Sequence, residues 1–132
     1  MEQNLNIIAI YAALNALLLL VLSYNVGRHR ARTGSLTPGA TGDAILIRAI
    51  RAHANASEYM PLAIIMLLVL ALVSASPALL HALGATFTLG RICQALGMVQ
   101  QKHPNGIRFT GNLLTGLVYL SGAIFCLYFA LT

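Results

Sequence analysis

Four polar residues in one segment of the chain have the types and the spacing of a binding site for a small anion or zwitterion. Arg48, Arg51, Asn55 and Glu58 follow one another at intervals of three, four and three residues. In an α-helix, at about 100° per residue, this spacing keeps the four side chains within about 80° of one another. We call this set the polar stripe. Because charged groups in or near hydrocarbon are energetically costly, we expect the stripe to point into a helix bundle, where Glu58 pairs with Arg51 or with an arginine of another helix.

Three further arginines are expected at the same boundary of the membrane, on the other helices. They are Arg30, Arg91 and Arg108. Several guanidinium groups with one balancing carboxylate suit a small zwitterionic or polyanionic ligand. An alternative remains open, in which the arginines of the stripe only set the topology and contact lipid headgroups, while its other two residues serve in packing.

The composition identifies the environment in which these groups must lie. Of the 132 residues, 58% are hydrophobic and 8% are charged, with 8 Lys and Arg against 3 Asp and Glu for a net charge of +5. A soluble domain carries about 25% charged residues, so this class is excluded. Two cysteines are too few for a disulfide scaffold, and a chain this apolar is not disordered. An integral membrane protein remains.

The charged residues leave three uncharged stretches, at 3–27, 59–90 and 109–132. The middle stretch is too long for one span of about 20 residues, and the sequence Ser74–Ala75–Ser76–Pro77 predicts that one helix stops there and another starts. Asp43 is the expected N-cap of the second helix. The sequence thus predicts an all-α integral membrane protein, a single domain over 1–132 with a four-transmembrane-helix bundle. The helices are expected at approximately 4–30, 43–73, 77–100 and 107–131.

The basic residues also predict a topology. All of them flank the first and third of the three predicted loops, whereas the N-terminus, the short second loop and the C-terminus carry none. The positive-inside rule places the two basic loops in the cytoplasm, and for a bacterial protein the membrane is then the cytoplasmic (inner) one. Because the membrane topology explains the excess of basic over acidic residues, no nucleic acid is expected as a partner.

Cysteine and histidine residues show no spacing typical of redox or metal sites. Cys93 and Cys126 are separated by far more than a Cys-x-x-Cys motif allows, and we expect packing thiols. The histidines lack a pattern such as His-x-x-x-His, so we predict no metal. They are His29, His53, His81 and His103.

Small and polar residues within the predicted spans suggest where helices touch. Asn15 and Ser121 are expected to form hydrogen bonds between helices. Glycines are expected at close helix contacts. They are Gly84, Gly90, Gly97, Gly111, Gly116 and Gly122.

The segment from Ile47 to Pro61 resembles a known family signature. It contains Arg-Ala-His-x-Asn-x-x-Glu-Tyr-x-Pro, which resembles the second helix of the MAPEG family, the membrane-associated proteins of eicosanoid and glutathione metabolism. The resemblance extends to Gly90–Arg91 and Ile107–Arg108, and the length and four-helix layout cover the whole chain. It is greatest to the short bacterial branch of the family.

The resemblance implies a homotrimer that binds glutathione between neighbouring subunits near the cytoplasmic boundary. Glu58 would bind the ammonium group of glutathione and the arginines its carboxylates. Arg108 matches the arginine that activates the thiol in catalytic members, since a nearby guanidinium favours the thiolate. The residues implied to contact or border glutathione are Arg30, Arg48, Arg51, Asn55, Glu58, Tyr59, Arg91 and Gln94. Gln94 and Met98 stand where the eicosanoid enzymes often carry an aromatic or imidazole group and a tyrosine.

The resulting hypothesis is a membrane-bound glutathione transferase or peroxidase, with glutathione as co-substrate and a lipophilic electrophile or lipid hydroperoxide that enters from the bilayer. Two alternatives remain. One is a small four-helix transporter in which Glu58 is a proton-coupled carboxylate. The other is a non-catalytic, lipid-binding trimer, because the family includes such a branch and Met98 cannot donate a hydrogen bond.

Overall fold

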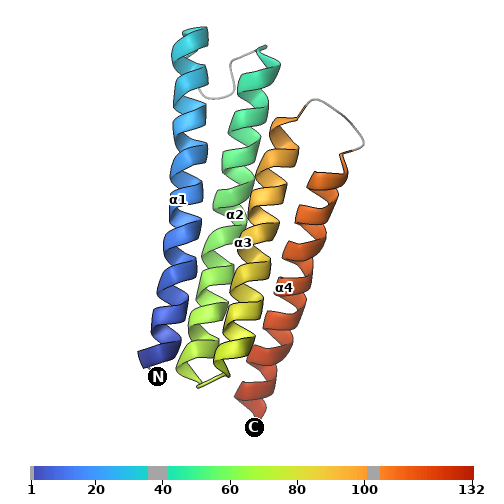
Figure 1. The fold of residues 1–132 in the computed structure, drawn as a ribbon. Coiled ribbons are helices and arrows are strands. Elements are labelled where there is room, and N and C mark those ends of the chain that lie inside the picture. Colours follow the sequence, from blue (N-terminus) through green and yellow to red (C-terminus); the bar gives the residue numbers. More distant parts are fainter. Residues whose placement is uncertain (1, 36–41, 101–104) are drawn as a thin grey trace.

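The protein folds into four antiparallel helices connected in an up-and-down order (Figure 1). The structure is a computed structural model that describes residues 2–35, 42–100 and 105–132. The helices are α1 (Glu2–Thr33), α2 (Ala44–Leu72), α3 (Pro77–Val99) and α4 (Gly106–Leu131). All four are long and apolar enough to cross a membrane. The prediction of a four-helix membrane bundle is confirmed.

Polar side chains begin three of the helices at positions that the sequence marks. Asp43 accepts a hydrogen bond from the Leu46 backbone N–H at 2.7 Å and caps α2. Ser76 caps α3, with Pro77 in its first turn. Asn105 accepts from the backbone N–H groups at the start of α4. Each cap satisfies backbone donors that have no partner within the helix, so these ends are set locally.

Glycines bring the helices into contact. A Cβ at Gly97 would overlap the backbone of Arg108, and a Cβ at Gly111 would overlap the backbone of Gln94. These contacts hold α3 against α4, and the ring of Tyr11 lies against Gly84 in the same way between α1 and α3. The prediction of close contacts is confirmed for these glycines and for Gly90.

Two sequence-based expectations about packing are wrong for this chain. Gly116 has open space where a Cβ would lie, because it is on the exposed side of α4. Ser121 donates to the carbonyl of Leu117 in its own helix rather than to another helix. Asn15, in contrast, donates to Thr88 Oγ1 at 2.9 Å and links α1 to α3 as expected.

The ends of α1 and α3 and the starts of α2 and α4 lie at one end of the bundle, and the α2–α3 turn, the start of α1 and the end of α4 lie at the other (Figure 1). The last turn of α1 carries Arg30 and Arg32, and the first turn of α4 carries Arg108. The basic residues of these helix ends therefore share one end of the molecule. Outward-facing side chains are largely apolar along all four helices, as lipid contact requires.

Candidate functional site

Three arginines from two helices line one cavity near the end of the bundle where α2 and α4 begin. Arg48 and Arg51 come from α2 and Arg108 from α4, and the volume is about 150 Å³. Ile47 and Met98 complete the lining. We call this the arginine cavity. Arg108 reaches it because the first turn of α4 packs directly on Gly97 of α3.

The positive charge of the arginine cavity is not balanced by an ion pair within the described parts of the chain. Among the described residues, the side chains of Arg48, Arg51 and Arg108 form neither an ion pair nor a hydrogen bond, and Arg48 Nε is buried without a partner. Guanidinium groups in this state attract carboxylates and other anions, which they bind through paired N–H donors. The cavity is therefore suited to an anionic ligand.

Arg91 lies apart from this cavity, and each of its three guanidinium nitrogens donates a hydrogen bond. Its Nη1 donates to Asn55 Oδ1 at 3.0 Å, and its Nε and Nη2 donate to Thr115 Oγ1 at 3.2 and 2.8 Å. The guanidinium also stacks over the ring of Tyr59, with 5.0 Å from Cζ to the ring centroid. Only 2% of Arg91 is exposed. These contacts join α2, α3 and α4 at one level of the bundle.

Tyr59 connects this cluster to Tyr119 of α4. The two rings meet edge to face, with 5.7 Å between centroids, and the Tyr119 hydroxyl donates to the Tyr59 carbonyl at 2.7 Å. Neither Thr115 nor Tyr119 was expected from the sequence as a site residue. A threonine flanked by apolar residues in a predicted span was a usable indication for Thr115, because a buried hydroxyl needs a hydrogen-bond partner in hydrocarbon.

The polar stripe does not point into the bundle as a unit, and this expectation was wrong. Arg51 and Glu58 are exposed, and Glu58 forms no ion pair among the residues that the structure describes. The buried face of α2 consists instead of small and apolar residues on the adjacent side of the helix. They include Ala49, Ala52, Ala56, Met60 and Ala63. Alanines permit closer helix packing than arginine or glutamate. The alanine face of α2 therefore packs inside the bundle, and the polar stripe lies at the edge of this buried face.

Two other residues implied by the resemblance lie outside the arginine cavity. Arg30, near the end of α1, donates to the Ser35 carbonyl at 3.4 Å. Gln94 is buried, and its Oε1 has no partner in the described parts of the chain. The structure thus brings Arg48, Arg51 and Arg108 together at one place, and Asn55, Tyr59 and Arg91 at another.

No group of three or more His, Cys, Asp or Glu residues within 2–35, 42–100 and 105–132 is arranged to hold a metal ion. The ionisable groups that gather are arginines, which do not bind metals because guanidinium is always protonated. The chemistry available at this end of the bundle is therefore anion binding and stabilisation of negative charge.

Known proteins are similar to this chain over two thirds or more of its length. The chain matches the MAPEG family over residues 8–128. It is 33% identical over 116 residues to the uncharacterized protein sll1147 of Synechocystis sp., a match that covers 88% of this chain and 84% of that protein. It is 37% identical over 89 residues to the inner membrane protein YecN of Escherichia coli, which covers 67% of each.

The fold and the cavity define a four-helix, multi-pass membrane protein with a cationic pocket at one end. The chain belongs to the MAPEG family, as the match over nearly its whole length establishes. The resemblance in the second-helix signature is thereby confirmed, and both bacterial relatives are consistent with a bacterial branch.

Proposed function

We propose that this protein is a glutathione-dependent transferase or peroxidase of the bacterial inner membrane. The observation that carries the proposal is the arginine cavity, in which three guanidinium groups stand without a counter-ion among the described residues. Glutathione supplies two carboxylates, one ammonium group and a thiol. The carboxylates match Arg48 and Arg51, which contribute several N–H donors each.

Glu58 completes the proposed match with glutathione. It lies seven residues after Arg51 on α2, which is about 10 Å along a helix axis, and its carboxylate is exposed and without an ion pair among the described residues. A carboxylate at this distance is suited to the ammonium group of a ligand whose carboxylates occupy the cavity. Opposite charges at the two ends of the site would orient the tripeptide.

Arg108 is the proposed catalytic residue. Its guanidinium lowers the pKa of a nearby thiol by favouring the thiolate, which is the nucleophile. In conjugation, the thiol proton passes to water, and the sulfur bonds to an electrophilic carbon whose leaving group departs with the bonding electrons. In peroxide reduction, the sulfur bonds to the terminal oxygen of the hydroperoxide to form a sulfenic acid, while the O–O bond breaks and the departing alkoxide takes a proton from water to leave as an alcohol. A second glutathione then converts the sulfenic acid to a disulfide and water.

A homotrimer is part of the proposal. Glu58 lies at the midpoint of the 29-residue α2, and an exposed carboxylate within a span is costly when it faces lipid. Contact with a second copy of the chain would remove Arg51 and Glu58 from lipid and place glutathione between subunits. Native mass spectrometry from detergent is expected to give three times the mass of one chain, and a monomer would refute this part.

The test of function is a titration of glutathione into the purified protein, followed by the ultraviolet absorbance of bound thiolate near neutral pH. We expect a saturable thiolate signal in the wild type and its loss in Arg108→Ala. Arg28→Ala is the matched control, because it removes an exposed arginine outside the cavity. Absence of binding at millimolar glutathione would refute the proposal. Binding without turnover of any electrophile or hydroperoxide would favour the non-catalytic, lipid-binding alternative.

One observation favours a second candidate, a proton-coupled transporter. Glu58 lies halfway along its helix without a partner among the described residues, whereas the sequence led us to expect arginines around it. Carboxylates at mid-membrane depth carry protons in many transporters. Proton-coupled substrate flux in proteoliposomes that Glu58→Gln abolishes would favour this function. Flux that is absent, together with a thiolate signal, would favour the transferase.

A further inference from the structure

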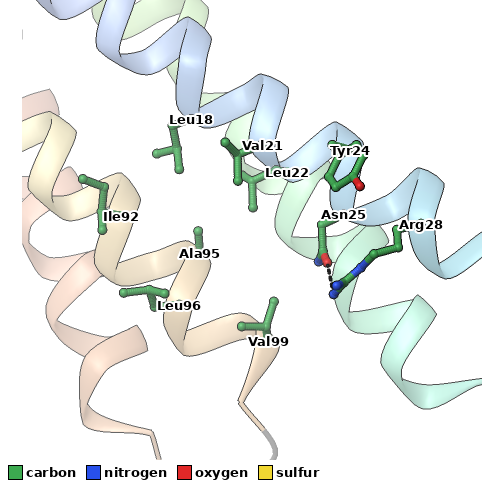
Figure 2. Close-up of a pocket in the computed structure, with 10 residues that line it drawn as sticks. All are labelled: Leu18, Val21, Leu22, Tyr24, Asn25, Arg28, Ile92, Ala95, Leu96 and Val99. Atoms are coloured by element: carbon green, nitrogen blue, oxygen red, sulfur yellow. Dashed lines mark hydrogen bonds between the residues drawn. The ribbon is translucent and has the colours of Figure 1, made fainter.

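A second cavity, unrelated to the arginine cavity, lies in the groove between α1 and α3 (Figure 2). Its volume is about 360 Å³. Most of the lining is aliphatic, from both helices, and three polar side chains of α1 gather at one end, as Figure 2 shows. The lining consists of Leu18, Val21, Leu22, Tyr24, Asn25, Arg28, Ile92, Ala95, Leu96 and Val99. We call this the α1–α3 groove.

The groove has the length and polarity of one lipid leaflet. From Leu18 to Arg28 is ten residues, about 15 Å along a helix, which is half of the hydrocarbon thickness of about 30 Å. The polar end, with Tyr24 and Arg28, lies toward the last turns of α1, at the end of the bundle where α4 begins (Figure 1). Tyrosine and arginine at this depth are typical of the membrane–water interface.

Arg28 gives the polar end an unbalanced positive charge. Its Nη2 donates to Asn25 Oδ1 at 3.3 Å, and the side chain forms no ion pair among the described residues. The amide of Asn25 is neutral, so this contact orients the guanidinium without neutralising it. The remaining N–H donors of Arg28 are available to an anion, and phosphate oxygens accept such pairs of donors well.

We propose that the α1–α3 groove binds an anionic phospholipid of the surrounding bilayer. Its phosphate is held by Arg28, with the Tyr24 hydroxyl beside it, and one acyl chain lies along the aliphatic walls. The occupant is a lipid and not a soluble anion because the walls bury an apolar chain one leaflet long. The site shares no residue with the arginine cavity, so this inference does not depend on the proposed function.

The chain contains no tryptophan, which allows a direct test with a single introduced reporter. Leu96→Trp and Val21→Trp place the indole on opposite walls of the groove, and Leu113→Trp places it on exposed α4 outside it. Leu96 and Leu113 are 53% and 50% exposed, which makes them a matched pair. Each variant is reconstituted with brominated phosphatidylglycerol or brominated phosphatidylcholine, and quenching of the fluorescence is measured against lipid fraction.

We expect phosphatidylglycerol to compete for the groove about five-fold more strongly than phosphatidylcholine, since one arginine near the surface contributes about this factor. The preference is expected at both groove reporters and not at Leu113→Trp. Arg28→Gln in the Leu96→Trp background is expected to remove it, whereas Arg108→Gln, which removes a charge at the same end, is expected to keep it.

Three results would overturn the proposal. Equal quenching by the two lipids at both groove reporters would mean that the groove takes lipid without regard to charge. The same preference for phosphatidylglycerol at Leu113→Trp would mean that the positive potential of the whole protein surface, and not the groove, causes the preference. Quenching that is absent at both groove reporters but present at Leu113→Trp would mean that protein, and not lipid, covers the groove. Two reporters on different walls keep the test valid if one variant does not fold.

Discussion

Arginine occurs in two contrasting environments in this bundle. Arg91 is buried and bonded to Asn55 and Thr115, whereas Arg51 and Arg108 line a cavity without partners among the described residues. The two places are close: Thr115, at the level of Arg91, is seven residues from Arg108, or about 10 Å along α4. Two neighbouring positions in one fold thus use the same side chain for different purposes.

The difference shows how packing divides one polar stripe between structure and ligand binding. Asn55 lies close enough to α3 to accept a hydrogen bond from Arg91, so it is used within the chain. Arg51, one turn earlier, lies beyond the packed contact and its charge remains available. A buried guanidinium whose donors are satisfied rigidifies a bundle, while an unsatisfied one is a site for an anion.

The largest expected effect comes from removing the structural arginine. Arg91→Ala leaves a cavity and deprives Asn55 and Thr115 of their partner, so we expect the free energy of unfolding to fall by about 3 kcal/mol. Thermal unfolding in detergent, followed by circular dichroism, measures this. Arg51→Ala is the comparison, with an expected change within about 0.5 kcal/mol. An equal decrease in the free energy of unfolding in the two variants would show that Arg91 and Arg51 do not differ in their structural role.

The reverse pattern is expected for activity. In the double variant Arg51→Ala, Arg108→Ala, we expect kcat/KM for glutathione conjugation to fall by about 100-fold, or about 2.7 kcal/mol, as when a stabilising donor is lost from an active site. The unfolding temperature is expected to stay near that of the wild type, because neither side chain bonds to another described residue. Unchanged conjugation would exclude these arginines from the site.

The sequence predicted the elements well because their signals are local. Uncharged runs, Asp43 as a cap and the Ser–Ala–Ser–Pro break each act within a few residues, and the structure has its helices and caps there. The rotation of α2 was not predictable to the same degree. Periodicity shows which residues share a face, but which face turns inward depends on packing against α3 and α1. Here the alanine face was preferred, so Glu58 is exposed instead of paired.

The sequence indicated which types of residue gather near the candidate site, but not how their side chains are arranged. Arg48, Arg51 and Arg108 line one cavity, whereas Arg91, for which a place at the border of the site was also expected, is bonded to Thr115 and Asn55 and does not line the cavity. The sequence gives no distance between residues 91 and 115. Only the register of α3 on α4, which depends on the glycine contacts, brings this threonine to that arginine.

That register can be tested directly. A Cβ at Gly111 would overlap the backbone of Gln94, so Gly111→Ala must push α4 away from α3, and we expect a loss of about 2 kcal/mol. Gly116→Ala is the control in the same helix. It meets open space, and alanine favours helix over glycine, so no loss is expected. Thermal unfolding of both variants measures the difference, and a tolerated Gly111→Ala would show that the contact does not set the spacing.

The smallest effect concerns a third arginine environment, the exposed ion pair of Arg32 with Asp43 at 2.9 Å. The pKa of Asp43 lies below its usual value, first because the Leu46 backbone N–H donates to the carboxylate, and then because Arg32 attracts it, while desolvation opposes both. A lowered pKa in the folded state means that the carboxylate stabilises the fold above its ordinary pKa of about 3.9 and that this contribution is lost as the pH falls through the folded value. Melting curves should therefore show a small loss of stability from about pH 5 to pH 3. Asp43→Asn keeps a capping oxygen but does not titrate, so the stability of this variant should fall less over the same pH interval. An identical pH dependence in the two proteins would show that neither the cap nor the ion pair favours the ionised form.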